Sequence, residues 1–240
     1  MLQGKTILVT GGTGYLGTGI CKKAAEYGAK VIFTYNKNTN SMQELLNQIP
    51  GSKAIQIDFR NVDDITKKIE QLYQEEPQID ILVNNASISQ IMPFAMLEEE
   101  DVDLVFDINL KGTIFMSKAV VRGMIKNKHG VIVNMGSIAG QRILDVPLTY
   151  AMSKAAIPGM THSLAAELKR FDIRVNTVIP GMMEEGVAKG IPDDLRQDFI
   201  NHCTRGRAGT DNDVSELVCF LASDKSSYIN GQNISIDGGV

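Results

Sequence analysis

The chain has 240 residues, of which 43% are hydrophobic and 22% charged, with a net charge of -4 at pH 7. This length and composition suit one α/β domain over residues 1–240. The negative net charge excludes a general attraction to nucleic acid or anionic membranes. Three widely spaced cysteines and three unclustered histidines predict neither structural disulfides nor a catalytic metal. The first residues enter an apolar strand without a signal-peptide pattern, and no apolar run reaches membrane-spanning length, so we expect a cytoplasmic protein.

Short apolar, β-branched runs alternate with segments of helical periodicity along the whole chain. The seven expected strands are 6–10, 31–35, 54–58, 79–83, 131–134, 173–178 and 234–236. The expected helices are 16–27, 62–73, 102–125, 150–169 and 214–221. This alternation predicts a single doubly wound domain, with a seven-stranded parallel sheet flanked by helices on both faces.

A glycine-rich turn follows the first strand directly. Residues 10–17 read Thr-Gly-Gly-Thr-Gly-Tyr-Leu-Gly and open the first helix. At such a turn backbone amides can approach a pyrophosphate closely, and the positive end of the helix dipole favours the negative charge. A plain tight turn would explain the glycines alone, but their place between a buried strand and a helix favours dinucleotide binding.

The end of the second strand carries no acidic residue to hold the adenosine ribose of NAD. Thr34, Asn36 and Lys37 stand there instead. Lys37 could pair with a 2′-phosphate while the other two donate hydrogen bonds, which favours NADP(H) over NAD(H) unless Lys37 is only a solvated loop charge. Asp58, which ends the third strand, could recognise the adenine amino group or could simply cap a turn or helix.

Tyr150 and Lys154 are one helical turn apart, so the phenol and the ammonium group share a face. A nearby cation stabilises the phenolate and would lower the pKa of Tyr150 from about 10 toward the working range. A half-buried tyrosine beside a solvated lysine would explain the pair equally well. Of the six tyrosines only Tyr150 has a lysine four residues on, and the dinucleotide signature favours a catalytic pair.

These motifs together resemble those of the short-chain dehydrogenase/reductase family, over essentially the whole chain to the closing segment 231–239. The resemblance implies a Rossmann-type fold. It implies that Asn109, Ser137, Tyr150 and Lys154 are the catalytic tetrad, with Ser137 at the usual thirteen residues before Tyr150. Ser137 and Asn109 have plainer explanations, as a strand-end hydroxyl and a locally bonded helix amide.

In the reaction that the resemblance implies, Ser137 and Tyr150 bind a substrate carbonyl and Tyr150 protonates the alkoxide that forms after hydride transfer. Lys154 would hold the nicotinamide ribose and lower the pKa of the tyrosine. Asn109 would support a water that links Lys154 to solvent.

The expected cofactor contacts run from the glycine-rich turn to the segment after the sixth strand. They are Gly11, Thr13, Gly14, Tyr15, Leu16, Gly17, Thr34, Asn36, Lys37, Asp58, Phe59, Asn85, Ala86, Ser87, Tyr150, Lys154, Pro180, Gly181 and Met183. Three positions depart from the family pattern. Tyr15 stands where the second motif glycine is expected, Ser87 replaces the glycine after Asn-Asn-Ala, and Glu185 replaces a threonine that often touches the cofactor.

Within the family the chain looks most like the 3-oxoacyl-acyl-carrier-protein reductases, in its length and in segments 126–130 and 227–232. Many sugar and alcohol dehydrogenases share these features, so they remain an alternative. By alignment Lys128 and Arg170 would dock an acidic carrier protein beside the cleft, unless they are ordinary surface cations.

The irregular stretch 181–210 is expected to form a mobile lid over the site. Its apolar side chains could line an acyl-chain pocket or pack the lid onto the core. These side chains are Met182, Met183, Ile191 and Phe199.

The resemblance also implies a homotetramer, built through helices 102–125 and 150–169 and the last strand. Pro158 is expected to kink the second of these helices. The alternative from another class is a dinucleotide-binding regulator or assembly subunit without catalysis, against which the complete tetrad argues.

Overall fold

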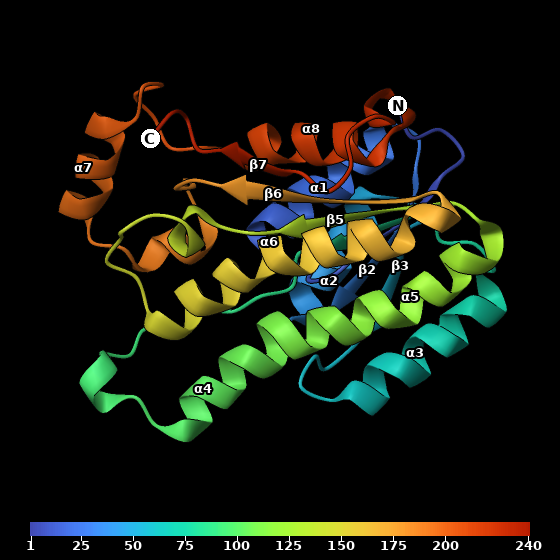
Figure 1. The fold of residues 1–240 in the computed structure, drawn as a ribbon, viewed down its shortest axis with the longest axis horizontal. Helices are drawn as coiled ribbons and strands as arrows, with labels where there is room; N and C mark the ends of the chain where they lie inside the picture. The colour runs from blue at the N-terminus through green and yellow to red at the C-terminus, as the bar shows by residue number, and fades with distance from the viewer.

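The computed structural model describes all of residues 1–240, and its centre is a single sheet of seven parallel strands (Figure 1). The strands are β1 (Thr6–Val9), β2 (Lys30–Tyr35), β3 (Lys53–Gln56), β4 (Ile81–Asn84), β5 (Gly130–Met135), β6 (Ile173–Pro180) and β7 (Asn233–Ile236). Their order is β3-β2-β1-β4-β5-β6-β7, so all seven predicted strands are confirmed. The order reverses between β1 and β4, where open α/β sheets bind ligands at the carboxyl ends of the strands.

Eight α-helices connect the strands. They are α1 (Tyr15–Glu26), α2 (Thr39–Gln48), α3 (Val62–Glu75), α4 (Glu99–Phe106), α5 (Thr113–Asn127), α6 (Leu148–Leu168), α7 (Asp193–His202) and α8 (Asp211–Ala222). The predicted helix 102–125 is interrupted by a π-helical segment (Asp107–Gly112) between α4 and α5. The sequence patterns missed α2 and α7 because α2 buries only Leu45 and α7 buries no residue.

The sheet carries a separate hydrophobic core on each face. Helices α1, α2 and α8 cover one face, and α3, α5 and α6 cover the other (Figure 1). Successive side chains of β1 alternate between the two, since Ile7 and Val9 join the first core and Leu8 the second. Burying each such side chain contributes roughly 1.5–3 kcal/mol. The carboxyl ends of the strands are therefore held on a sheet that is packed from both sides.

Helix α6 carries the predicted catalytic pair and is continuous through Pro158. Proline has no amide hydrogen, so the carbonyl of Lys154, four residues earlier, lacks its usual helical partner. None of the helices combines the length and the apolar character needed to cross a membrane.

Candidate active site

A cavity of 680 Å³ opens along the carboxyl ends of the strands, and its size is typical of ligand-binding clefts. Nearly all the expected cofactor contacts line it: Gly11, Thr13, Gly14, Tyr15, Leu16, Gly17, Thr34, Asn36, Phe59, Asn85, Ala86, Ser87, Tyr150, Lys154, Pro180, Gly181 and Met183. Lys37 and Asp58 do not line it. Residues from distant parts of the sequence thus meet in one cleft.

The glycine-rich turn is fixed by hydrogen bonds from neighbouring strand ends. The amide of Gly11, whose φ is 64°, donates to the Thr34 hydroxyl at 3.0 Å. The Asn85 side-chain amide donates to the carbonyl oxygens of Thr10 and Gly11 at 2.9 and 3.1 Å. A side chain at Gly17 would collide with the carbonyl oxygen of Gly11. The turn therefore requires glycine at these positions.

The first turn of α1 fits a bound pyrophosphate. Its N-cap, Gly14, offers no side chain to cap the helix, and the first turn contains no acidic residue. The amides at a helix start have no intrahelical partner and carry the positive end of the helix dipole. Together with the cavity that they face, these uncapped amides match the phosphates of a dinucleotide.

The adenosine end of the site contains two contacts that the sequence did not reveal. The Thr34 side chain is buried, and its hydroxyl already accepts the Gly11 amide, so Thr34 fixes the turn. Asp58 lies outside the cavity and forms an ion pair with Arg60 at 2.7 Å. The hydrogen bond from Arg60 holds the pKa of Asp58 below its usual value, and the charge of Lys37 adds to this effect. The adenine contact of Asp58 stays a prediction.

Ser137 and Tyr150 face each other in the cavity. Ser137 follows β5, Tyr150 lies in the first turn of α6, and both side chains line the cavity. Burial raises the pKa of Tyr150 and the nearby Ser137 hydroxyl opposes that rise. The net direction is the reverse of the lowering that the sequence suggested, because removal from water penalises the phenolate more than the serine hydroxyl stabilises it. Tyr150 is accordingly a protonated donor at neutral pH.

Lys154 is buried below this pair. Lys154 is only 6% exposed, and its Nζ donates a hydrogen bond to the carbonyl oxygen of Met135 at 3.0 Å. The Nζ lies 5.7 Å from the centre of the Tyr150 ring. Burial lowers the pKa of Lys154 to about 8. The lysine is thus a buried cation that can lose its charge in mildly alkaline solution.

Asn109 lies in the π-helical segment and does not line the cavity. Its side-chain oxygen accepts from the Ile88 amide, and its side-chain nitrogen donates to the Ile88 carbonyl and to the Ser153 hydroxyl. All these distances are 2.9 or 3.0 Å. Asn109 therefore connects the segment after β4 to α6, next to the catalytic pair, and π-helical segments often occur at functional sites.

The outer part of the cavity is mainly apolar. The predicted wall of Met182, Met183, Ile191 and Phe199 lines it. Sequence reasoning missed the segment between Ser137 and Tyr150, from which Leu144 and Val146 enter the cavity, and α7, which contributes Leu195. Leu144 and Val146 lie between Ser137 and Tyr150 in the sequence, and this position could have indicated that they line the cavity.

The predicted placement of Lys128 and Arg170 beside the cleft is wrong for a single chain. Lys128 ends α5 just before β5, and Arg170 follows α6 just before β6. Both residues lie at the amino ends of the strands, whereas the cavity lies at the carboxyl ends. A six-residue strand such as β5 separates these edges by roughly 20 Å.

Comparisons with known proteins agree with this site. A family model described as enoyl-(acyl carrier protein) reductase matches residues 14–240. The whole chain is 36% identical to the 3-oxoacyl-[acyl-carrier-protein] reductase FabG of Thermotoga maritima, over 98% of that protein. It is 37% identical to oxidoreductase UcpA of Salmonella typhimurium, over 99% of this chain and 95% of that protein.

A solved short-chain dehydrogenase/reductase from Serratia marcescens superposes with a TM-score of 0.91 at 30% identity, over 99% of this chain and 98% of that one. The chain belongs to the short-chain dehydrogenase/reductase family. As a member of this family it is an oxidoreductase of carbonyl and alcohol groups that uses a nicotinamide dinucleotide. The uncapped start of α1 and the buried Lys154 are where this short-chain dehydrogenase/reductase would hold that cofactor.

Proposed function

We propose that the protein is an NADPH-dependent carbonyl reductase that converts a 3-oxoacyl thioester, linked to acyl carrier protein or coenzyme A, to its 3-hydroxyacyl form. The observation that carries this proposal is that Ser137, Tyr150 and the buried Lys154 line one cavity whose lining also includes many apolar side chains. Relatives named 3-oxoacyl-[acyl-carrier-protein] reductases support the substrate class.

In the proposed reduction a bound nicotinamide supplies the hydride. The hydroxyl groups of Ser137 and Tyr150 donate hydrogen bonds to the carbonyl oxygen and favour the charge that develops on it. The electron pair of the carbonyl double bond moves to oxygen, which takes the phenolic proton of Tyr150. Positively charged Lys154 stabilises the resulting phenolate until solvent returns a proton. General acid catalysis of this kind contributes about 10²–10⁴-fold.

The preference for NADPH rests on the residues after β2. Asn36 lines the cavity, exposed Lys37 follows it, and no carboxylate stands at this position. A 2′-phosphate would find a cation and an amide donor here, whereas a ribose hydroxyl would lack its usual acidic partner.

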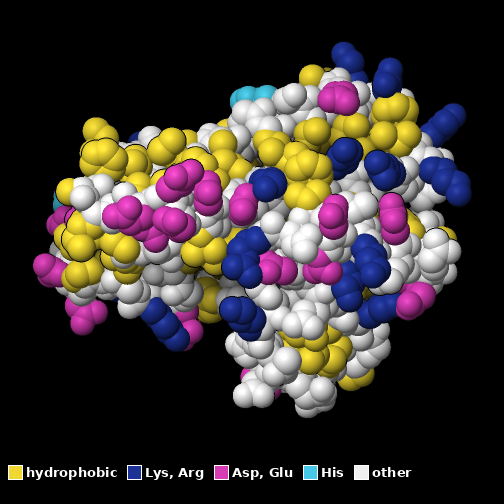
Figure 2. Space-filling model, turned by 90° about the horizontal axis from the view of Figure 1, so that it is seen from below, with side chains coloured by type: hydrophobic (Ala, Val, Ile, Leu, Met, Phe, Trp, Pro, Cys, Tyr) yellow, Lys and Arg dark blue, Asp and Glu magenta, His cyan; other side chains and the backbone are white.

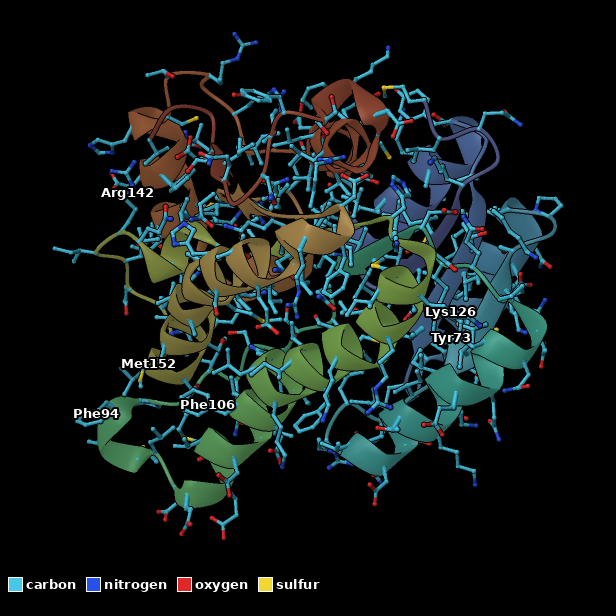
Figure 3. All side chains as sticks on the ribbon, turned by 45° about the vertical axis from the view of Figure 1, so that its right-hand side comes forward. Tyr73, Phe94, Phe106, Lys126, Arg142 and Met152 are labelled. Atoms are coloured by element: carbon cyan, nitrogen blue, oxygen red, sulfur yellow. The ribbon has the colours of Figure 1, made fainter.

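Exposed apolar side chains support an acyl substrate. Phe94, in the segment after β4, is 77% exposed, and Met152 on α6 is 50% exposed. Both lie at the same edge of the molecule as Arg142, which is in the segment between Ser137 and Tyr150 (Figure 3). Such side chains offer an apolar approach beside the cavity.

A homotetramer is proposed from the outer face of α4, α5 and α6. Acidic residues lie at the start of α4 and basic residues along α5, and Figure 2 shows a cluster of acidic groups toward the left and most basic groups, with further acidic ones among them, in the centre and toward the right. The acidic residues are Glu98, Glu99, Glu100, Asp101 and Asp103, and the basic residues are Lys118, Arg122, Lys126 and Lys128. Antiparallel pairing of two copies would bring opposite charges together.

Helix α6 strengthens this assembly proposal. It has no charged residue between Lys154 and Glu167 although it has exposed positions, and space is open around Gly159. A helix whose exposed side carries small residues and no acidic or basic side chain other than His162 over this stretch can pack closely against another subunit. Light scattering that shows a concentration-independent monomer would overturn the assembly proposal.

We place the activity in the cytoplasm. All three cysteines, Cys21, Cys203 and Cys219, are free and buried, as expected in a reducing compartment.

An alternative is a sugar, polyol or other secondary-alcohol dehydrogenase, since relatives named only oxidoreductase UcpA are equally similar. The discriminating assay follows NADPH absorbance with acetoacetyl thioester on acyl carrier protein and on coenzyme A, beside crotonyl thioester and a panel of sugars and alcohols. Carrier-dependent oxidation of NADPH with the 3-oxoacyl form is expected. Turnover confined to the alcohols, or cofactor binding without any turnover, would instead establish the alcohol dehydrogenase or the non-catalytic regulator.

A further inference from the structure

Tyr15 places a large side chain in a turn that is otherwise rich in glycine. It is the first residue of α1, directly after the N-cap Gly14, and it lines the cavity. The uncapped amides proposed to hold the pyrophosphate belong to the same helical turn. A bulky residue at this position therefore borders the phosphate site.

Two other segments contact the Tyr15 side chain. Its hydroxyl accepts the backbone amide of Asp211, the first residue of α8, at 3.1 Å. A Cβ atom built at Gly186 would lie 3.3 Å from the Cβ of Tyr15 and 3.6 Å from its Cδ1. Gly186 has a φ of 77°, which glycine adopts without strain. Tyr15 thus joins the phosphate turn to α8 and to the segment after β6.

Gly186 begins a short helical segment, Gly186–Gly190, that forms one wall of the cavity through Val187 and Ala188. Its other end approaches the segment after β4, because a Cβ at Gly190 would lie 3.1 Å from the Cδ1 of Ile91. The wall consequently lies close to Tyr15 at one end and close to Ile91 at the other.

Tyr15 is uncharged where it lies. Burial raises its pKa, and the carboxylates of Asp211, Glu184 and Glu185 add to this rise, against the opposing effect of the Asp211 amide. A neutral phenol can border two phosphates without charge repulsion, and it leaves the uncapped amides of α1 free to bind them.

We propose that Tyr15 is a cofactor-positioning residue that fastens residues 184–190, which include the wall segment Gly186–Gly190, beside the pyrophosphate turn, so that release of the dinucleotide requires this contact to open. The proposal rests on nicotinamide dinucleotide binding at the α1 turn. It does not depend on the identity of the carbonyl substrate or on preference for NADPH.

The test measures the dissociation rate of NADPH, and separately of NADH, by stopped-flow displacement from the full-length protein. Tyr15→Ala is expected to dissociate the cofactor about tenfold faster, because the hydrogen bond to Asp211 and the contact of the ring with Gly186 are lost. Tyr15→Phe keeps the ring against Gly186 and loses only the hydrogen bond, so an increase of about threefold is expected. Tyr228→Ala, at a fully exposed tyrosine outside the cavity, is the matched control and should leave the rate unchanged.

Hydrogen exchange of residues 184–190 is the second readout. Bound cofactor should protect these amides in the wild type and in Tyr15→Phe, and should protect them less in Tyr15→Ala. Dissociation at the wild-type rate in both Tyr15 variants, with unchanged protection, would overturn the proposal; if Tyr15→Ala fails to fold, the rate in Tyr15→Phe decides. A wild type that binds neither dinucleotide would refute cofactor binding itself, which is a different failure.

Discussion

The catalytic end and the adenosine end of the cleft are built in different ways. At the catalytic end Ser137, Tyr150 and Lys154 come from β5 and α6, and Lys154 is buried against the Met135 carbonyl. At the adenosine end Lys37 is exposed and Asp58 pairs with the exposed side chain of Arg60. Groups fixed by the packed core can supply precise chemistry, while exposed charges tune affinity and exchange partners easily.

The largest effect is expected from a substitution at the catalytic end. Tyr150→Phe removes the proton donor but keeps the ring, so kcat for reduction should fall about 10²–10⁴-fold. Steady-state kinetics and equilibrium titration with NADPH would separate proton donation from cofactor binding, because the affinity for NADPH should stay within about twofold of the wild-type value. Tyr228→Phe serves as the control; a Tyr150→Phe variant with wild-type kcat would rule out the proposed mechanism.

The buried charge of Lys154 makes the catalytic end sensitive to pH and lowers the free energy of unfolding of the protein. Its pKa in the folded protein is about 8, below the ordinary value of 10.5, so between these values the unfolded chain binds more protons and stability rises with pH. Lys154→Met should raise the free energy of unfolding at pH 7 by up to about 3 kcal/mol while abolishing most turnover. This gain should shrink as the pH rises from 8 to 10.5.

Urea denaturation of both proteins at pH 7 and pH 10 measures this difference. A gain that is equal at both pH values would show that the charge of Lys154 is not the cause. In the wild type, kcat for reduction should also decline as the pH rises through about 8, because the charge that stabilises the Tyr150 phenolate is lost.

Lys37 is the residue at the adenosine end that is expected to bind the 2′-phosphate of NADPH. Lys37→Ala should raise the KM for NADPH about tenfold and leave the KM for NADH within about twofold, as expected for loss of one charge-assisted contact to a 2′-phosphate. Lys22→Ala, another exposed lysine, is the control. Equal effects on both cofactors would remove Lys37 from the phosphate site.

Asp58 should show the smallest effect. Because its carboxylate lies outside the cavity and is held by Arg60, Asp58→Asn should change the dissociation constant of NADPH by less than about twofold. Isothermal titration would reveal a contact with adenine if binding instead weakened about tenfold.

The same contrast explains how much the sequence could predict. The seven strands follow from buried apolar periodicity, and the Tyr150–Lys154 pair follows from helical spacing. Ser137 was predicted only through the family resemblance. Helix α7 was missed because it buries no residue and so shows little periodic signal.

Pairing between side chains was less predictable. The sequence does not reveal the Asp58–Arg60 ion pair, and it does not reveal that the Gly11 amide donates a hydrogen bond to the Thr34 hydroxyl. The placement of Lys128 and Arg170 beside the cleft of a single chain failed although strands 131–134 and 173–178 were predicted directly after them, because it was taken from alignment and not from the strand ends.

The most direct test of the Ser137–Tyr150–Lys154 site is to follow hydride transfer itself. Acetoacetyl-acyl carrier protein would be incubated with NADPH carrying deuterium at C4 of the nicotinamide, and the 3-hydroxyacyl product examined by mass spectrometry. Both hydrogens at C4 are replaced by deuterium, so that the label is transferred whichever face of the nicotinamide reacts. We expect one deuterium on the former carbonyl carbon with the wild type and almost no product with Tyr150→Phe. A product without deuterium, or equal labelled product from both proteins, would contradict the proposed reduction.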